Sequence, residues 1–138
     1  MRLAIIGSRT FDDLTLMTTV IRGFLNSKHR IDMLVSGGAR GADSLAEMVA
    51  KELDIPINVY EVTPEDWSKY GKSAGHRRNI KIEENSDAVL AFCSGKFGST
   101  PGTKNCVLLF VQHNKPVVIV EDLGSNAPSI YKYAINPV

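Results

Sequence analysis

Short apolar runs and helical spacings alternate along this chain. Short runs at residues 2–6, 31–35, 57–60, 87–92 and 116–120 predict five strands, the first of them buried. Apolar residues spaced three or four positions apart predict helices near 14–25, 42–53 and 103–113, and the more polar stretch 74–84 is also expected to be helical. Strands that alternate with helices through short turns favour right-handed crossovers. The pattern therefore predicts an α/β fold, an open parallel sheet of about five strands with helices on both faces.

The length suits one domain. The chain has 138 residues, of which 43% are hydrophobic and 22% charged, an ordinary composition for a soluble globular protein. We expect a single domain over 1–138, with 121–138 forming a C-terminal tail whose structure the pattern leaves open. The apolar residues of this tail, Ile130, Tyr131 and Tyr133, could wrap the sheet or contact a second subunit in a homo-oligomer.

Charge and cysteine content exclude several classes of function. A net charge of +1 gives no electrostatic reason to expect nucleic acid or an acidic membrane as the main partner. The two cysteines, Cys93 and Cys106, form no disulfide framework and have no metal-ligand spacing. The chain starts with a strand rather than a signal peptide, and no apolar run approaches the roughly 20 residues that span a bilayer. We expect a cytoplasmic protein with no membrane partner.

The most informative stretch is residues 36–43, where glycines lie between a predicted strand and a predicted helix. Glycine allows a tight turn and lets a ligand approach the backbone, and the first turn of a helix attracts anions. This arrangement predicts a phosphate-binding loop; the alternative is a glycine-rich turn that holds no ligand. The candidate binding residues in this loop are Ser36, Gly37, Gly38, Ala39 and Gly41.

Two other strand ends carry small and polar residues on the same predicted edge of the sheet. In an open parallel sheet the ligand lies outside the carboxyl ends of the strands. The candidates on these two loops are Gly7, Ser8, Arg9, Gly98, Ser99, Gly102 and Thr103. The basic helix between them adds Arg77, Arg78 and Asn79, and the two arginines point about 100° apart, so one of them is expected to face the ligand.

Several residues have two interpretations. Asp43, in the first turn of its helix, could hold a ribose hydroxyl, act as an acid or base, or simply begin the helix. Trp67 and Tyr70 could line a pocket and stack on a base, or pack against the edge of the core. The three histidines are scattered, so we expect no metal. Neither G-x-G-x-x-G nor a Walker A motif is present, so we expect no NAD, FAD or other cofactor.

Five segments together resemble a known superfamily. They are Gly-Ser-Arg-Thr-Phe at 7–11, Ser-Gly-Gly-Ala-Arg-Gly-Ala-Asp at 36–43, Asp-Trp-x-x-Tyr-Gly-Lys-x-Ala-Gly at 66–75, Arg-Asn at 78–79 and Gly-Thr at 102–103. The set resembles the small YspA-like branch of the SLOG superfamily, which groups the Smf/DprA proteins with the LOG phosphoribohydrolases. The resemblance covers about residues 1–120 and implies a Rossmann-like fold that binds a nucleotide or a nucleotide derivative.

The same resemblance leaves three functions open. LOG enzymes hydrolyse the N-glycosidic bond of nucleoside monophosphates with a helix arginine, matched by Arg77 or Arg78, and a glutamate after a loop like 98–103; here Lys104, Asn105 and Cys106 follow instead. The first expectation is therefore a binding or sensing protein for a small nucleotide. The alternative is an N-ribosidic hydrolase with Asp43 and Arg78 as catalytic residues and Asp43 or Glu47 replacing the glutamate. The third, a DNA-associated protein like DprA, conflicts with the near-neutral charge.

Overall fold

The computed structural model describes residues 1–27, 30–124 and 128–133. Their strands are β1 (Arg2–Gly7), β2 (Met33–Ser36), β3 (Ile57–Val59), β4 (Ala88–Cys93), β5 (Val117–Glu121) and β6 (Ser129–Lys132). The helices are α1 (Leu14–Asn26), α2 (Ala42–Glu52), α3 (Pro64–Tyr70), α4 (Ala74–Glu84) and α5 (Pro101–Gln112), with 3₁₀ turns η1 (Gly71–Ser73) and η2 (Phe97–Ser99).

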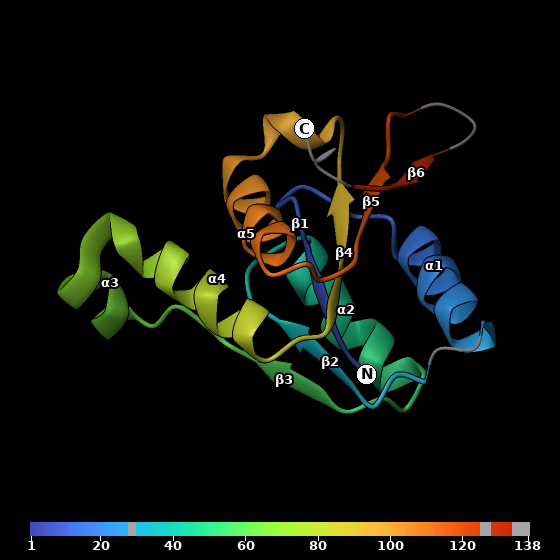
Figure 1. Ribbon diagram of the computed structural model, residues 1–138, viewed down its shortest axis with the longest axis horizontal. Coiled ribbons are helices and arrows are strands. Elements are labelled where there is room, and N and C mark those ends of the chain that lie inside the picture. Colours follow the sequence, from blue (N-terminus) through green and yellow to red (C-terminus); the bar gives the residue numbers. More distant parts are fainter. Residues whose placement is uncertain (28–29, 125–127, 134–138) are drawn as a thin grey trace.

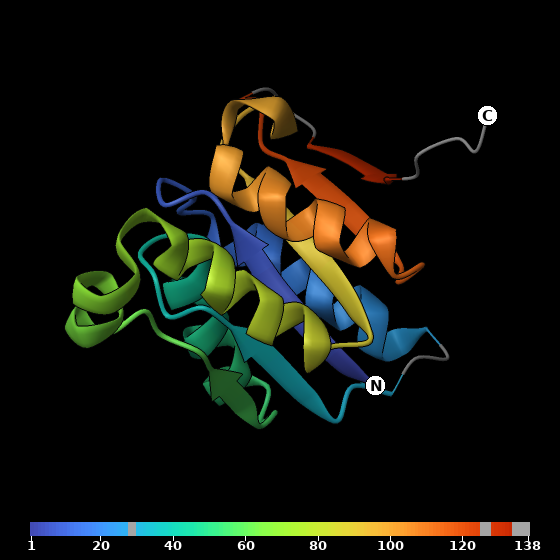
Figure 2. The same cartoon turned by 60° about the vertical axis from the view of Figure 1, so that its left-hand side comes forward.

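The described strands form one sheet in the order β3-β2-β1-β4-β5-β6. All neighbours are parallel except β5 and β6, which pair antiparallel. Helices α1 and α2 cover one face, and α4 and α5 cover the other (Figures 1 and 2). The fold is therefore the expected α/β, Rossmann-like open sheet with helices on both faces.

The alternation of side chains along β1 divides the core into two halves. Leu3 and Ile5 pack in the cluster that includes the buried face of α1 and α2, whereas Ala4 and Ile6 pack in the cluster beneath α4 and α5. All four are buried. Because a central strand of a parallel sheet is covered on both faces, its sequence is continuously apolar rather than alternating.

Side-chain caps fix the starts of two helices. The Asp13 carboxylate accepts a hydrogen bond from the Leu16 amide at 2.9 Å and caps α1. Thr63 and Asp66 form a reciprocal capping box around Pro64, the first residue of α3. The box fixes the first turn of α3. Helix α3 projects from the body of the molecule beside α4 (Figure 2).

The structure refines the predicted boundaries and adds one strand. Helix α5 carries apolar residues almost all round, and Leu108 and Leu109 are only partly buried because α5 lies on the outside of the sheet. The predicted tail 121–138 contains β6, a sixth strand that the sequence pattern did not predict. Residues 125–127 and 134–138 of that tail lie outside the described residues. Every helix in the described part of the chain is too short or too polar to cross a bilayer.

The order of the strands reverses between β1 and β4. The chain moves outward from β1 through β2 to β3, returns through α3 and α4, and continues from β4 toward the other edge. The loops that leave β1 and β4 therefore diverge to opposite faces, and a crevice opens at the carboxyl ends of these strands. This topology positions the candidate site.

Two loops cross closely at this edge, and Gly41 makes the crossing possible. Gly41 has a φ of +72°, and a Cβ built on it would lie 2.3 Å from the Ser8 carbonyl oxygen and 2.5 Å from the Arg9 carbonyl carbon. Backbone atoms cannot move aside as the end of a flexible side chain can. A residue with a side chain therefore cannot occupy this position without separating the loops.

We predict that Gly41→Ala lowers the free energy of unfolding by about 2–4 kcal/mol, the sum of a left-handed backbone cost and the clash. Gly124→Ala is the matched control, because Gly124 also has a φ of +72° but a Cβ built on it would have no atom within 4 Å. The free energy of unfolding of Gly124→Ala is expected to fall by only about 1–2 kcal/mol, the cost of the backbone conformation alone. Chemical denaturation of both variants measures the difference; equal losses would contradict the close-crossing explanation.

Candidate functional site

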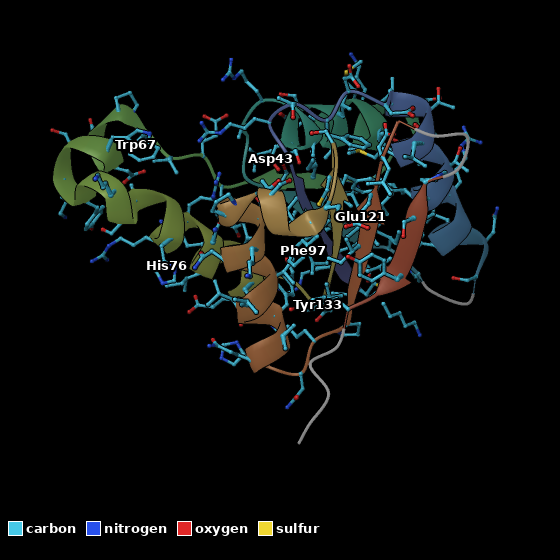
Figure 3. The ribbon with its side chains drawn as sticks, turned by 90° about the horizontal axis from the view of Figure 1, so that it is seen from above. Asp43, Trp67, His76, Phe97, Glu121 and Tyr133 are labelled. Carbon is cyan, nitrogen blue, oxygen red and sulfur yellow. The ribbon has the colours of Figure 1, made fainter. Side chains whose placement is uncertain are left out.

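A cavity of about 480 Å³ opens at the carboxyl ends of β1 and β4. It lies at the crevice that the strand order predicts, and Asp43, labelled in the view from above (Figure 3), is one of its lining residues. Three loops and one face of α4 contribute its walls. The lining residues are Ile6, Gly7, Ser8, Arg9, Thr10, Ala39, Asp43, Arg78, Asn79, Ile82, Ser94, Ser99, Thr100, Pro101, Gly102, Thr103 and Cys106.

Ser8 connects the loops that form the cavity. Its amide donates to the Phe92 carbonyl at 2.9 Å, and its carbonyl accepts from the Ala42 amide at 3.1 Å. Its hydroxyl accepts from the Ser94 amide at 3.1 Å and lies 3.3 Å from the Thr100 hydroxyl. One buried residue thus joins the ends of β1 and β4 to the start of α2 and the approach to α5.

The glycine-rich loop at 36–43 uses much of its hydrogen-bonding capacity internally. The Gly38 amide donates to the Ser36 hydroxyl at 3.4 Å, and the Ala39 amide donates to the Asp43 carboxylate at 3.1 Å. The Ala42 amide donates to the Ser8 carbonyl. Of this loop, only Ala39 and Asp43 line the cavity. The loop consequently positions Asp43 and Arg78 more than it offers free amides.

Arg78 is held in place by two hydrogen bonds. Its Nη1 donates to the Gly37 carbonyl at 2.9 Å, and its Nε donates to the Asn79 side-chain oxygen at 3.0 Å. Its Nη2 has no hydrogen-bond partner within residues 1–27, 30–124 and 128–133. The guanidinium is thus oriented by the protein while part of it stays available to a ligand in the cavity.

Asn79 extends this network to α5. Its side-chain nitrogen donates to the Gly102 carbonyl at 3.3 Å and to the Asn105 side-chain oxygen at 3.1 Å. The same Asn105 oxygen lies 3.0 Å from Nδ1 of His76. This chain of polar side chains links α4 to the first turn of α5. It therefore fixes the position of Arg78 relative to the start of α5.

The start of α5 presents unpaired backbone donors. Pro101 has no N–H, and the first helical amide with a partner is that of Lys104, which donates to the Thr100 carbonyl at 3.0 Å. The amides of Gly102 and Thr103 have no acceptor among the described residues, and both residues line the cavity. With the positive end of the helix dipole, they form a site that favours an anion.

Asp43 is a buried carboxyl that lies beside Arg78, since a Cβ built on Gly37 would be 2.3 Å from Nη1 of Arg78 and 3.0 Å from Oδ2 of Asp43. It is 7% exposed, and its Oδ2 accepts from the Ala39 amide. Burial raises the pKa of the Asp43 carboxyl above its ordinary value of 3.8, against the opposing effects of the Ala39 amide and the Arg78 guanidinium. The carboxyl is therefore closer to neutrality than a surface aspartate, which suits a proton donor or acceptor.

Cys106 lies one turn into α5 and also faces the cavity. It is 2% exposed, and burial raises the pKa of its thiol to about 12. The thiol is therefore protonated and unreactive near neutral pH, because the thiolate is the nucleophilic form. Cys106 contributes shape rather than chemistry. The described residues contain no group of three or more His, Cys, Asp or Glu side chains that could hold a metal ion.

Residues at the end of β5 and after β6 also contact the loop between β4 and α5. Glu121, at the end of β5, accepts a hydrogen bond from the Phe97 amide at 2.7 Å. The Phe97 ring packs against Tyr133, with ring centroids 5.3 Å apart. Figure 3 shows these three residues grouped beside the loop that leads to the cavity. Tyr133, the residue that follows β6, thus packs against the loop that leads to residues 99–103.

The structure gathers part of the predicted set of site residues. The predicted residues that line the cavity are Gly7, Ser8, Arg9, Ala39, Asp43, Arg78, Asn79, Ser99, Gly102 and Thr103. The predicted residues that do not line it are Ser36, Gly37, Gly38, Gly41, Trp67, Tyr70, Arg77 and Gly98. Trp67 is 47% exposed on α3, away from Asp43 (Figure 3). Of the two arginines, Arg78 faces the cavity, and Arg77 stacks on the Tyr70 ring at 4.0 Å.

Other lining residues were not predicted. They are Ile6, Thr10, Ser94, Thr100, Pro101, Ile82 and Cys106. Thr10 and Ser94 could have been found, because each follows the carboxyl end of a predicted strand. Ile82 and Cys106 carry no such signal, because apolar helix positions predict core and not cavity wall.

Comparison with known proteins identifies a relative of nearly the same length. The chain is 35% identical over 125 residues to the Gene 61 protein of Mycobacterium phage D29, an alignment that covers 85% of this chain and 94% of that protein. No protein-family profile matches the chain, and no solved structure matches it.

We predict that Asp43→Asn becomes more stable relative to the native protein as the pH rises from 4 to 7. Since the folded pKa of Asp43 is raised, the unfolded carboxyl ionises first above 3.8, and this lowers the native protein's free energy of unfolding. Asp43→Asn has no carboxyl at this position, so its free energy of unfolding does not fall for this reason as the pH rises. Urea denaturation across this pH range measures the difference between the two proteins.

Asp66→Asn is the control, because the pKa of Asp66 is shifted in the opposite direction from that of Asp43. The Thr63 amide, the largest cause, holds the pKa of the exposed Asp66 carboxyl below its ordinary 3.8. Its stabilising contribution is present above that pH and is lost on acidification, so Asp66→Asn is expected to be less stable at pH 7. A stability difference for Asp43→Asn that does not change with pH would contradict the burial argument.

Proposed function

The chain belongs to the same protein family as the Gene 61 protein of Mycobacterium phage D29, and we propose that it binds a small nucleotide or nucleotide derivative in the cavity between β1 and β4. The observation that carries the proposal is the convergence on one cavity of the unpaired Gly102 and Thr103 amides and the oriented Arg78 guanidinium. Both favour an anion of the size and charge of a phosphate. The resemblance of the sequence to the SLOG superfamily points to the same class of ligand.

The charges within the cavity orient the proposed ligand. A phosphate is attracted to the start of α5 and to Arg78, and the Asp43 carboxylate repels it. We therefore expect the phosphate at the start of α5 and a sugar hydroxyl beside Asp43, whose side chain can accept a hydrogen bond from it. Hydroxyl groups of Ser8, Thr100 and Thr103 line the same wall. Arg9, exposed at the mouth of the cavity, adds a second cation.

We predict that the purified protein retains a nucleotide from a mixture of ribonucleoside mono-, di- and triphosphates, and that Arg78→Ala binds it about 10–100-fold more weakly. The loss corresponds to roughly 1.5–3 kcal/mol for a hydrogen bond to a charged group. Mass spectrometry of the retained fraction identifies the ligand, and isothermal titration measures both affinities.

The control is Arg40→Ala. Arg40 lies in the same glycine-rich loop, is exposed and does not line the cavity. Its removal changes the net charge equally but is expected to leave the affinity within twofold. A native protein that retains no nucleotide, or an Arg78→Ala variant that binds as tightly as Arg40→Ala, would refute the proposed site.

A second function, hydrolysis of an N-ribosidic bond, is favoured by one observation. Asp43 is a buried carboxyl with a raised pKa in the same cavity as the proposed phosphate site. A carboxyl in that state can take a proton from water or give one to a leaving base. Asp43 would then act in place of the glutamate that the sequence lacks after Thr103.

Under this second function, we predict that free base accumulates with time when the protein is incubated with the retained nucleotide. Asp43→Asn is expected to lower the rate by at least about a hundredfold, the usual size of an acid–base contribution, while the nucleotide still binds. Liquid chromatography of the reaction measures base release. If the native protein returns the nucleotide intact after prolonged incubation, it is a binding protein and not a hydrolase.

A further inference from the structure

A second hollow, of about 120 Å³, lies between the end of β3, α3 and α4. Tyr60 and Glu61 contribute to it from the segment after β3, and Tyr70 contributes from the end of α3. Arg77 and Arg78 contribute from α4, and Arg78 also lines the main cavity. One residue, Arg78, thus forms part of the walls of both spaces.

The Gly37–Gly38 step brings the two spaces close together. A Cβ on Gly37 would lie 2.3 Å from Nη1 of Arg78, and a Cβ on Gly38 would lie 2.5 Å from Cγ of Glu61. Arg78 and Glu61 therefore lie directly against the backbone of two successive residues. Side chains at these positions would separate them, so the paired glycines allow a ligand held at Arg78 to reach Glu61.

The polar groups that line the second hollow differ in whether they already have partners within the protein. The Asp66 carboxylate already accepts from the Thr63 amide at 2.9 Å. The Arg77 guanidinium already stacks on the Tyr70 ring. The Glu61 carboxylate, in contrast, has no hydrogen-bond or ion-pair partner in the part of the chain that the structure describes. Both oxygens of Glu61 are therefore open to a ligand, whereas one oxygen of Asp66 is already used.

From this juxtaposition we propose that the second hollow is the subsite for a nucleobase with an exocyclic amino group, whose N–H donates to Glu61 while the phosphate of the same ligand lies beyond Arg78. The proposal rests on the nucleotide-binding function proposed above. A cationic ligand does not fit, because Arg77, Arg78 and Lys81 line the same hollow. A neutral ring with N–H donors does fit, since bases stack on tyrosine rings and guanidinium planes and hydrogen-bond to carboxylates.

Two pairs of ligands that differ in the amino group provide the test. CMP is compared with UMP, and GMP with IMP, by isothermal titration, with ribose 5-phosphate as the ligand without a base. We expect the amino-bearing member of at least one pair to bind about tenfold more tightly than its partner. In Glu61→Gln this preference is expected to fall to twofold or less. Circular dichroism checks that the exposed substitution leaves the fold intact.

Glu65→Gln is the matched control, because Glu65 is an exposed acid on α3 that lines neither space. It is expected to keep the full preference. Equal binding within both pairs, or a preference that survives in Glu61→Gln, overturns the subsite. If ribose 5-phosphate still binds in that case, the proposed nucleotide-binding function stands. If neither ribose 5-phosphate nor any of the four nucleotides binds, the proposed function and the subsite fail together.

Discussion

The hydrogen bonds of the Ser8 backbone and hydroxyl are the constraint on which the candidate site depends. At the carboxyl edge of a parallel sheet each strand leaves polar groups that need partners, and an unpaired buried group costs free energy. Ser8 satisfies several at once, pairing with Phe92, Ala42, Ser94 and Thr100. The loops after β1 and β4 and the start of α2 consequently cannot move independently. Gly41 has no side chain because the Ser8 carbonyl lies where a Cβ would be.

Around this fixed edge, hydrogen bonds within the protein orient the polar residues of the cavity. Arg78 is bound by Gly37 and Asn79, and Asn79 is bound to α5, so the guanidinium and the free amides of α5 share one rigid frame. A site that is ordered in advance loses less entropy on binding. Asp43 shows the cost of such an arrangement, because a buried carboxyl with a raised pKa destabilises the folded chain when it ionises.

The same frame extends beyond the cavity in two directions. On one side, Glu121 and the Phe97–Tyr133 ring pair hold the β4–α5 loop, so the antiparallel strand β6 and the residue after it support the wall formed by residues 99–103. On the other side, Arg78 connects the cavity to the hollow beside Glu61. Elements at both edges of the sheet thus contribute to one region, although the sequence separates them widely.

The sequence by itself determined the five parallel strands, the helices between them and the edge of the sheet where the site lies, because these follow from local apolar spacing and from the rules of crossover connections. Position after a strand end likewise identified Gly7, Ser8, Arg9, Ser99 and Thr103. Only the tertiary structure decided which residues face the cavity. Local spacing could not show that the amides of the 36–43 loop are used by Ser36, Asp43 and Ser8, that Arg78 rather than Arg77 turns inward, or that Trp67 lies outside. Each of these depends on contacts between residues that are distant in the chain, and β6 likewise forms because β5 offers it an unpaired edge.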